Sequence, residues 1–225
     1  MTKLHHKALA AVLGVLIAMA ILLFVPAGTI TYWQAWVFLA VYGVCSLAIT
    51  LYLMKRDPGL LERRLRGGPI AEKKATQKII QSLTALGFVA MLVVPAIDHR
   101  FRGSRVPPFV VLAGDVLLAG GFLMVFFVFR ENTFASATIE VAREQQVIST
   151  GPYALVRHPM YAGSLVWLIG MSLALGSWWG PVVLLVILPA LIWRIFDEER
   201  FLAGNLPGYR EYSQTVRYRL LPYVW

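Results

Sequence analysis

Residues 151–163 read Gly151-Pro152-Tyr153-Ala154-Leu155-Val156-Arg157-His158-Pro159-Met160-Tyr161-Ala162-Gly163, and the apolar segment 160–176 begins inside this stretch. One Arg, one His and two Tyr therefore stand at the start of a segment that is apolar enough to enter a bilayer. Polar and ionisable groups are costly in a membrane and usually serve a function there. The stretch predicts a membrane-embedded helix with a polar site at its first turn.

The composition of the whole chain also indicates a membrane protein. Of its 225 residues, 58% are hydrophobic and 15% are charged, whereas soluble domains average about 45–50% and about 25%. The net charge is +9, but the basic residues fall in short loops between apolar runs. We therefore expect contact with membrane lipids and no nucleic-acid partner. The single cysteine, Cys45, excludes an internal disulfide, and no residue spacing supports a metal site.

Apolar segments divide the chain into six parts, at roughly 8–25, 33–54, 79–97, 107–129, 160–176 and 180–196. A full helical span needs about 20 residues, and the first four segments meet that length. The last two are short and joined only by residues 176–180, which predicts a tight helical hairpin. The predicted fold class is all-α: one multi-pass helical membrane domain, 1–225, with four spans in 1–129, unusual polar chemistry in 130–225 and a C-terminal cytoplasmic helix.

The basic residues predict the orientation of these segments. Only Arg100, Arg102 and Arg105 of the 21 Lys and Arg residues fall on one side, and the other 18 fall on the side of both termini. The positive-inside rule then predicts an integral membrane protein with both termini cytoplasmic. The basic loop 55–78 is expected to determine topology and to face lipid headgroups.

The polar stretch has a counterpart at the end of the last apolar segment. Arg194 and Glu198 are four residues apart, so they share one face of a helix, while Glu199 points about 100° away. Pro159 is expected to begin the preceding helix, with His158 at its cap and Arg157 beside the free N–H groups, where a carboxylate is well placed. Because the hairpin is short, both clusters should lie at the same membrane face. The same side chains also suit an ordinary anchor at the lipid headgroups.

Four stretches of the chain closely resemble the isoprenylcysteine carboxyl methyltransferase family, which is related to phospholipid methyltransferases. They are Gln145-Gln146-Val147-Ile148-Ser149-Thr150-Gly151-Pro152-Tyr153, Arg157-His158-Pro159-Met160-Tyr161-Ala162-Gly163, Arg194 with Glu198-Glu199, and Gly208-Tyr209-Arg210-Glu211-Tyr212 with Leu221-Pro222-Tyr223. The resemblance covers residues 130–225 and implies that this part is a donor-binding core.

The resemblance implies S-adenosylmethionine as the methyl donor and S-adenosylhomocysteine as the product. It places the donor at the cytoplasmic side, beneath a tunnel for a lipophilic or lipidated acceptor. The residues it assigns to the donor are Gln145, Gln146, Val147, Ile148, Tyr153, His158, Pro159, Met160, Tyr161, Glu198 and Glu199. Arg194 would face the acceptor, and Arg194, Glu198 and Arg157 are the candidate catalytic residues.

Several functions remain open at this point. The first is carboxyl O-methylation of an isoprenylcysteine-like group, and the second is phospholipid N-methylation. A membrane reductase with a nicotinamide cofactor fits less well, because such enzymes tend to carry Asn and an acid where this chain has Met160 and Ser164. The last is a non-enzymatic membrane scaffold. The attacking atom of the acceptor and the oligomeric state also remain open.

Overall fold

The structure is a computed structural model that describes residues 3–72, 74–139, 141 and 145–225. Lys73 of the predicted basic loop lies outside these residues. The described chain is all-α, as predicted, with eight α-helices and two short 3-10 helices. They are α1 (Lys3–Ala27), α2 (Trp33–Arg56), α3 (Pro58–Leu65), η1 (Pro69–Ala71), α4 (Ala75–Phe101), α5 (Pro108–Glu131), η2 (Gly151–Ala154), α6 (Pro159–Ala174), α7 (Trp179–Asn205) and α8 (Tyr209–Thr215).

Five of these helices are long and apolar enough to cross a membrane: α1, α2, α4, α5 and α7. The sixth apolar helix, α6, is shorter, as the sequence predicts. The chain is thus a multi-pass helical membrane protein. Its last long helix differs from the prediction, because α7 continues to Asn205 instead of ending near residue 196. Hydropathy marks where apolar residues stop, but a helix ends only where its backbone hydrogen bonds end, and charged residues continue this one.

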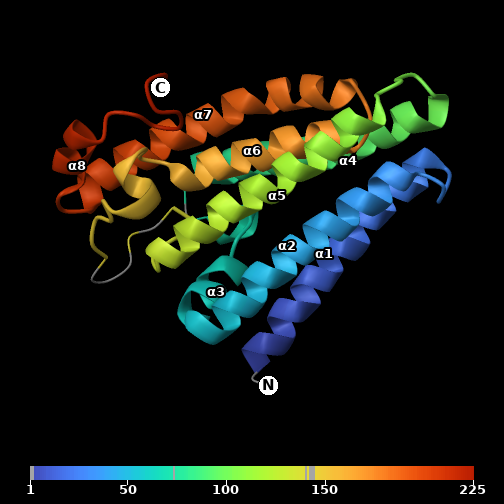
Figure 1. Ribbon diagram of the computed structural model, residues 1–225. Coiled ribbons are helices and arrows are strands. Elements are labelled where there is room, and N and C mark those ends of the chain that lie inside the picture. Colours follow the sequence, from blue (N-terminus) through green and yellow to red (C-terminus); the bar gives the residue numbers. More distant parts are fainter. Residues whose placement is uncertain (1–2, 73, 140, 142–144) are drawn as a thin grey trace.

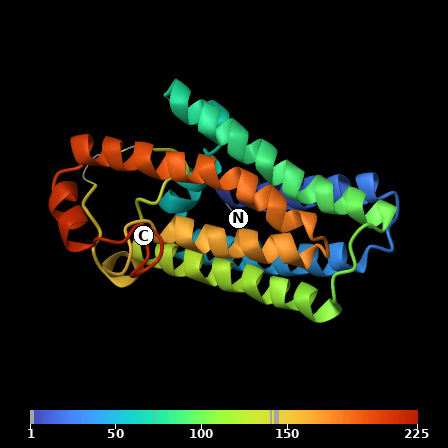
Figure 2. The same cartoon turned by 90° about the horizontal axis from the view of Figure 1, so that it is seen from above.

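The helices form two groups that meet at one end and separate at the other. Figure 1 shows α1 and α2 side by side, diverging from α5, α6 and α7 toward the N-terminus, with α3 between the groups. Figure 2 shows α4 and α7 running along the opposite side of the bundle from α5. We call the separated end, which carries Arg64, Glu72, His158 and Glu198, the polar end.

Helices α5 and α6 pack most closely, because small residues line both surfaces. A Cβ added to Gly121 would lie 2.6 Å from the Cβ of Trp167, and one added to Gly114 would lie 2.5 Å from the backbone nitrogen of Ala174. Small residues let membrane helices approach closely and gain van der Waals contact. This packing holds α6 against α5.

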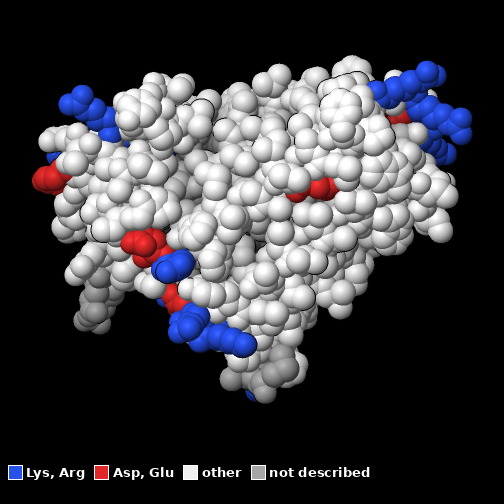
Figure 3. Space-filling model, in the orientation of Figure 1, with Lys and Arg blue, Asp and Glu red and all other residues white. Residues whose placement is uncertain are grey.

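Polar contacts close the end opposite the polar end. Ser177 donates to Asp98 at 2.6 Å, and Tyr32 donates to the Leu175 carbonyl at 2.5 Å. Gly176 takes the left-handed conformation (φ 66°) that turns the chain from α6 into α7. On the face drawn in Figure 3, a broad band without Lys or Arg separates the two charged ends. That band matches the apolar part of the long helices.

Candidate active site

The site is built at the first turn of α6. As predicted, α6 begins at Pro159 with His158 as its cap residue. The backbone N–H groups of Arg157 and His158 donate to the carbonyls of Tyr218 and Arg219, both at 2.9 Å. The C-terminal segment therefore holds the start of α6 in place, and Tyr161 points from the first turn toward α7.

Three side chains form a hydrogen-bonded line between α6 and α7. Arg194 donates from Nε to the Tyr161 hydroxyl at 2.9 Å, and Tyr161 donates to Glu198 Oε2 at 2.5 Å. Arg194 and Glu198 do share one face of α7, as predicted, but Tyr161 stands between them. The charge-assisted bonds of this line fix the Glu198 carboxylate at the polar end of the bundle.

The guanidinium of Arg194 has no donor left for another ligand. Its Nη1 donates to Gln77 Oε1 at 2.7 Å and to Glu72 Oε1 at 3.1 Å. Its Nη2 donates to Glu72 Oε1 at 3.1 Å and to the Ala137 carbonyl at 3.3 Å. With the Nε–H on Tyr161, all five N–H groups are used. Arg194 is buried, and it acts as the centre of a network that joins α7, α6 and the start of α4.

Glu199 lies in a different environment from Glu198. Its carboxylate contacts Arg157 at 3.2 Å, His158 at 3.3 Å and Arg219 at 3.0 Å. The two arginines neutralise it, and the three contacts together tie the C-terminal segment to α6 and α7. Glu199 lines neither of the two cavities described next, although the family resemblance assigns it to the donor.

A polar cavity lies between α7, α8 and two stretches of chain, 132–139 and 145–158. It encloses about 110 Å³. Of the residues assigned to the donor by resemblance, it brings together Gln145, Gln146, Val147, Ile148, Tyr153, His158, Met160 and Glu198, and Arg157 joins them. Leu202, Leu206 and Tyr209 add an apolar wall on the α7 and α8 side.

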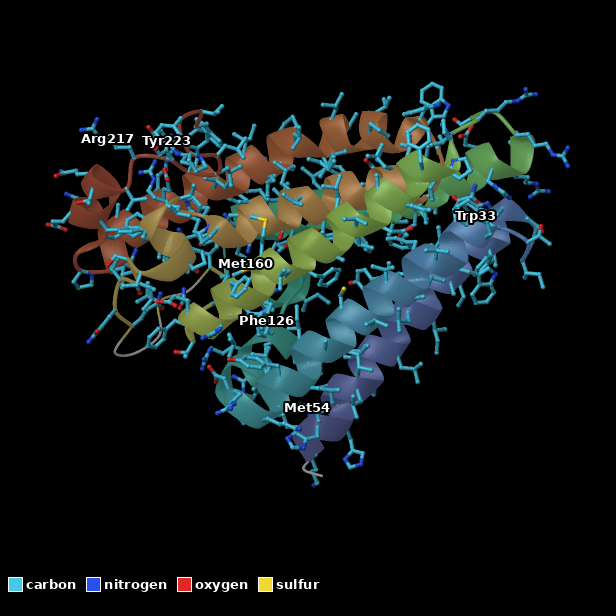
Figure 4. All side chains as sticks on the ribbon, in the orientation of Figure 1. Trp33, Met54, Phe126, Met160, Arg217 and Tyr223 are labelled. Atoms are coloured by element: carbon cyan, nitrogen blue, oxygen red, sulfur yellow. The ribbon has the colours of Figure 1, made fainter. Side chains whose placement is uncertain are left out.

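A larger and more apolar cavity adjoins the polar one, with a volume of about 460 Å³. It extends from Tyr161, Arg194 and Glu198 to Phe88 and Ile187 between the membrane helices. The two cavities share eight residues: Ser136, Thr138, Ile139, Tyr153, Arg157, His158, Met160 and Glu198. Of the predicted donor residues, Pro159 and Tyr161 line only this second cavity. Figure 4 labels Met160 at the start of α6, in the region that both cavities border.

Tyr153 stands in the wall between the two cavities. Burial, together with the negative charge of Glu198, raises the pKa of its hydroxyl to about 12. Tyr153 therefore keeps its proton at neutral pH. It accepts a hydrogen bond from Asn132 at 2.8 Å, and its carbonyl accepts one from Tyr212 at 2.8 Å. These contacts hold the ring against the cavity.

Sequence reasoning missed the contribution of the basic loop 55–78. Glu72 and Gln77 are both buried and bind Arg194, and Arg64 lines the apolar cavity. Glu72 also accepts from the Ile139 backbone N–H at 3.4 Å, which links the loop to the segment that follows α5. The only local signal was the acid itself, an isolated Glu among basic residues.

Comparison with known proteins shows which family the chain resembles. Residues 109–207 match the family described as phospholipid methyltransferase. The probable protein-S-isoprenylcysteine O-methyltransferases of Oryza sativa, from subspecies indica and japonica, are 32% identical over 139 residues. That alignment covers 59% of this chain and 68% of theirs. The chain belongs to this family of S-adenosylmethionine-dependent membrane methyltransferases.

Two further relatives of the chain are described as proteins of other functions. The Delta(14)-sterol reductase of Mus musculus is 33% identical over 91 residues, 39% of this chain and 22% of the reductase. The cobalt-zinc-cadmium resistance protein CzcN of Cupriavidus metallidurans is 29% identical over 119 residues, 52% of this chain and 51% of that protein. The chain thus matches about a fifth and about half of the length of these two proteins.

Proposed function

We propose that this chain transfers a methyl group from S-adenosylmethionine to a lipophilic or membrane-proximal acceptor. The observation that carries the proposal is the shared wall of the two cavities, in which Glu198, Met160 and Tyr153 face both spaces. A polar donor on one side and an apolar acceptor on the other would meet at this wall. The combined space falls within the roughly 300–1,000 Å³ that small-molecule sites occupy.

The residues of the polar cavity fit the chemistry of the donor. S-adenosylmethionine supplies an electrophilic methyl group on a sulfonium, and it also carries an ammonium group, hydroxyls and a flat adenine. Glu198 would accept hydrogen bonds from the ammonium or the hydroxyls, with its position held by Tyr161. Val147, Ile148 and Leu206 offer apolar contact for the adenine.

The same walls would promote the reaction by positioning and by excluding water. A carboxylate loses its hydration in an apolar cavity. Its attack on the methyl group of the cationic sulfonium cancels both charges, because the products are an ester and a neutral thioether, and this is favourable without water. Holding donor and acceptor in line reduces the entropic barrier. A carboxylate acceptor needs no base, so Arg194, Tyr161 and Glu198 would act by orientation.

The acceptor we favour is the carboxylate of an isoprenylcysteine-like group, because the larger cavity lies between membrane helices and the rice relatives carry that name. The second candidate is the amine of a phospholipid, which the family match favours. An amine must lose a proton, and Glu198 would be its base, since Glu199 is occupied by Arg157, His158 and Arg219. Purified protein supplied with labelled donor and either phosphatidylethanolamine or an isoprenylcysteine would separate the two.

The first experiment is calorimetric binding of S-adenosylhomocysteine to the detergent-purified chain. We expect micromolar affinity, and we expect Glu198→Gln to weaken it at least tenfold, because the carboxylate that would hold the ligand becomes neutral. Glu211→Gln on α8 is the matched control, since Glu211 is exposed and lines neither cavity. Undiminished binding by Glu198→Gln would remove the proposed donor site.

A further inference from the structure

A third space adjoins the site along the face of α6 that carries Met160, Ser164 and Trp167. It encloses about 350 Å³ between α1, α2, α3, α5 and α6, and apolar side chains such as Val12, Ile49 and Phe122 line most of it. It shares Arg64, Met160, Ser164 and Trp167 with the 460 Å³ cavity. Two largely apolar cavities thus meet at one guanidinium, which belongs to Arg64 on α3.

The short helix α3 and the contacts of the Arg64 side chain hold it where the two cavities meet. Asp57 caps α3 by accepting from the Leu60 N–H at 2.8 Å, and the buried Leu60 and Leu61 lie one turn before Arg64 on the same side of the short helix. Arg64 itself donates from Nη1 to the Ser136 carbonyl at 3.1 Å and lies over the Phe129 ring at 5.0 Å. A contact of 3.6 Å joins the same nitrogen to the Met160 sulfur.

The charge of Arg64 is not neutralised by any described part of the protein. No described carboxylate forms an ion pair with it, and no described acceptor contacts its Nη2 or Nε. Burial lowers the pKa of the guanidinium, and Arg194 lowers it further. A partly buried cation without an anion is costly, and a guanidinium with spare donors suits a carboxylate or a phosphate.

The charge and the N–H donors of Arg194, unlike those of Arg64, are fully paired within the protein. Glu72 pairs with it, and all five of its N–H groups have partners. An acceptor oxyanion could bind Arg194 only by displacing part of that network, whereas Arg64 offers unused donors beside the same cavity.

We propose that Arg64, and not Arg194, binds the oxyanion of an amphiphilic acceptor whose apolar part lies in the cavities that meet at Arg64. This inference rests on the proposed function, because the bound molecule is a methyl acceptor only if the chain transfers a methyl group. The shared chemistry is a carboxylate or a phosphate attached to long apolar chains. Arg194 is then a positioning residue that holds Tyr161 and Glu198.

The test measures the preference of the full, detergent-purified chain for an acid over its uncharged counterpart. One arm compares N-acetyl-S-farnesylcysteine with its methyl ester, and the other compares dioleoylphosphatidic acid with dioleoylglycerol, each by equilibrium binding of the radiolabelled probe. We expect the wild type to prefer one acid at least tenfold, and that arm identifies the oxyanion. Arg64→Gln should abolish the preference. Arg66→Gln, an exposed residue at the end of the same helix, should retain it.

Two results would overturn the proposal: a wild type that prefers neither acid, or an Arg64→Gln protein that keeps the wild-type preference. If Arg64→Gln fails to fold, Arg64→Lys decides instead, because Lys keeps the charge but loses the planar fork. Its preference should fall at least threefold, and an unchanged value would contradict the inference. Binding of S-adenosylhomocysteine is measured on the same samples. Its absence from the wild type sinks the proposed function alone, whereas its retention in Arg64→Gln shows an intact donor site.

Discussion

Glu198 and Glu199 show how one residue step separates two tasks. A helix turns about 100° per residue, so Glu198 points to Tyr161 and the two cavities, while Glu199 points to Arg157, His158 and Arg219. The first carboxylate keeps one oxygen, Oε1, without a described partner and is available for a ligand. The second carboxylate is saturated by protein groups and stabilises the fold.

We therefore expect Glu199→Gln to lower stability and to leave donor binding nearly unchanged. The substitution removes the charge that holds three cationic or polar partners, each hydrogen bond to a charged group being worth about 1.5–3 kcal/mol. A stability loss of about 2 kcal/mol, followed by thermal unfolding in detergent, is the expected result. The affinity for S-adenosylhomocysteine should stay within about twofold. A stable protein that no longer binds the ligand would show that Glu199 belongs to the donor site after all.

Among the helices, the contact of α5 with α6 positions the site most directly. The Gly121 and Gly170 surfaces bring the two backbones together, which fixes where the first turn of α6, and therefore Met160 and Tyr161, must lie. Adjacent Gly120 faces open space, because a Cβ built there meets no atom within 4 Å. The two neighbouring glycines thus differ in packing alone.

Replacing each of these glycines with alanine separates packing from helix propensity. Gly121→Ala should destabilise the protein by about 1–3 kcal/mol, because the new methyl overlaps Trp167 and the interior is already filled. Gly120→Ala should be neutral or should stabilise by up to about 1 kcal/mol, the difference between the helix propensities of Ala and Gly. Melting temperatures in one detergent provide the comparison. Equal effects at both positions would contradict close packing as the role of Gly121.

At the scale of the whole molecule, the charge distribution and the site agree. The end that carries the site also carries most of the Lys and Arg residues, while Arg100, Arg102 and Arg105 stand at the other end. The positive-inside rule places the site at the cytoplasmic face, where a soluble donor is available and an acceptor can enter from the inner leaflet. We propose this orientation for the protein.

Single cysteines introduced at the two ends test the orientation. In a Cys45→Ala background, which removes the only native thiol, Arg105→Cys should react with a membrane-impermeant maleimide on intact cells. Gln214→Cys on α8 should react only after the membrane is opened. Both positions are exposed, so access to the reagent depends on the membrane alone. The reversed pattern would invert the proposed topology.

Several features could be predicted because each depends on residues close together in the chain. They are the apolar helices and their order, the start of α6 at Pro159, and the common face of Arg194 and Glu198. Hydropathy and helical periodicity are local properties, and the membrane requires every span to satisfy its backbone internally. The motif around residues 145–163 likewise carries its own signature. The length of α7 was underestimated because its last turns are helical without being apolar.

What the amino-acid sequence determined by itself was therefore the set of membrane helices and the two polar clusters, residues 145–161 and 194–199, that lie at one end of them. Only the tertiary structure decided which of those residues are free to bind a ligand. Glu72 reaches Arg194 across 122 residues and occupies it, and α3 places Arg64 where two cavities meet. Such pairings arise from how distant helices pack, and packing leaves no local pattern in the chain from which it could be predicted.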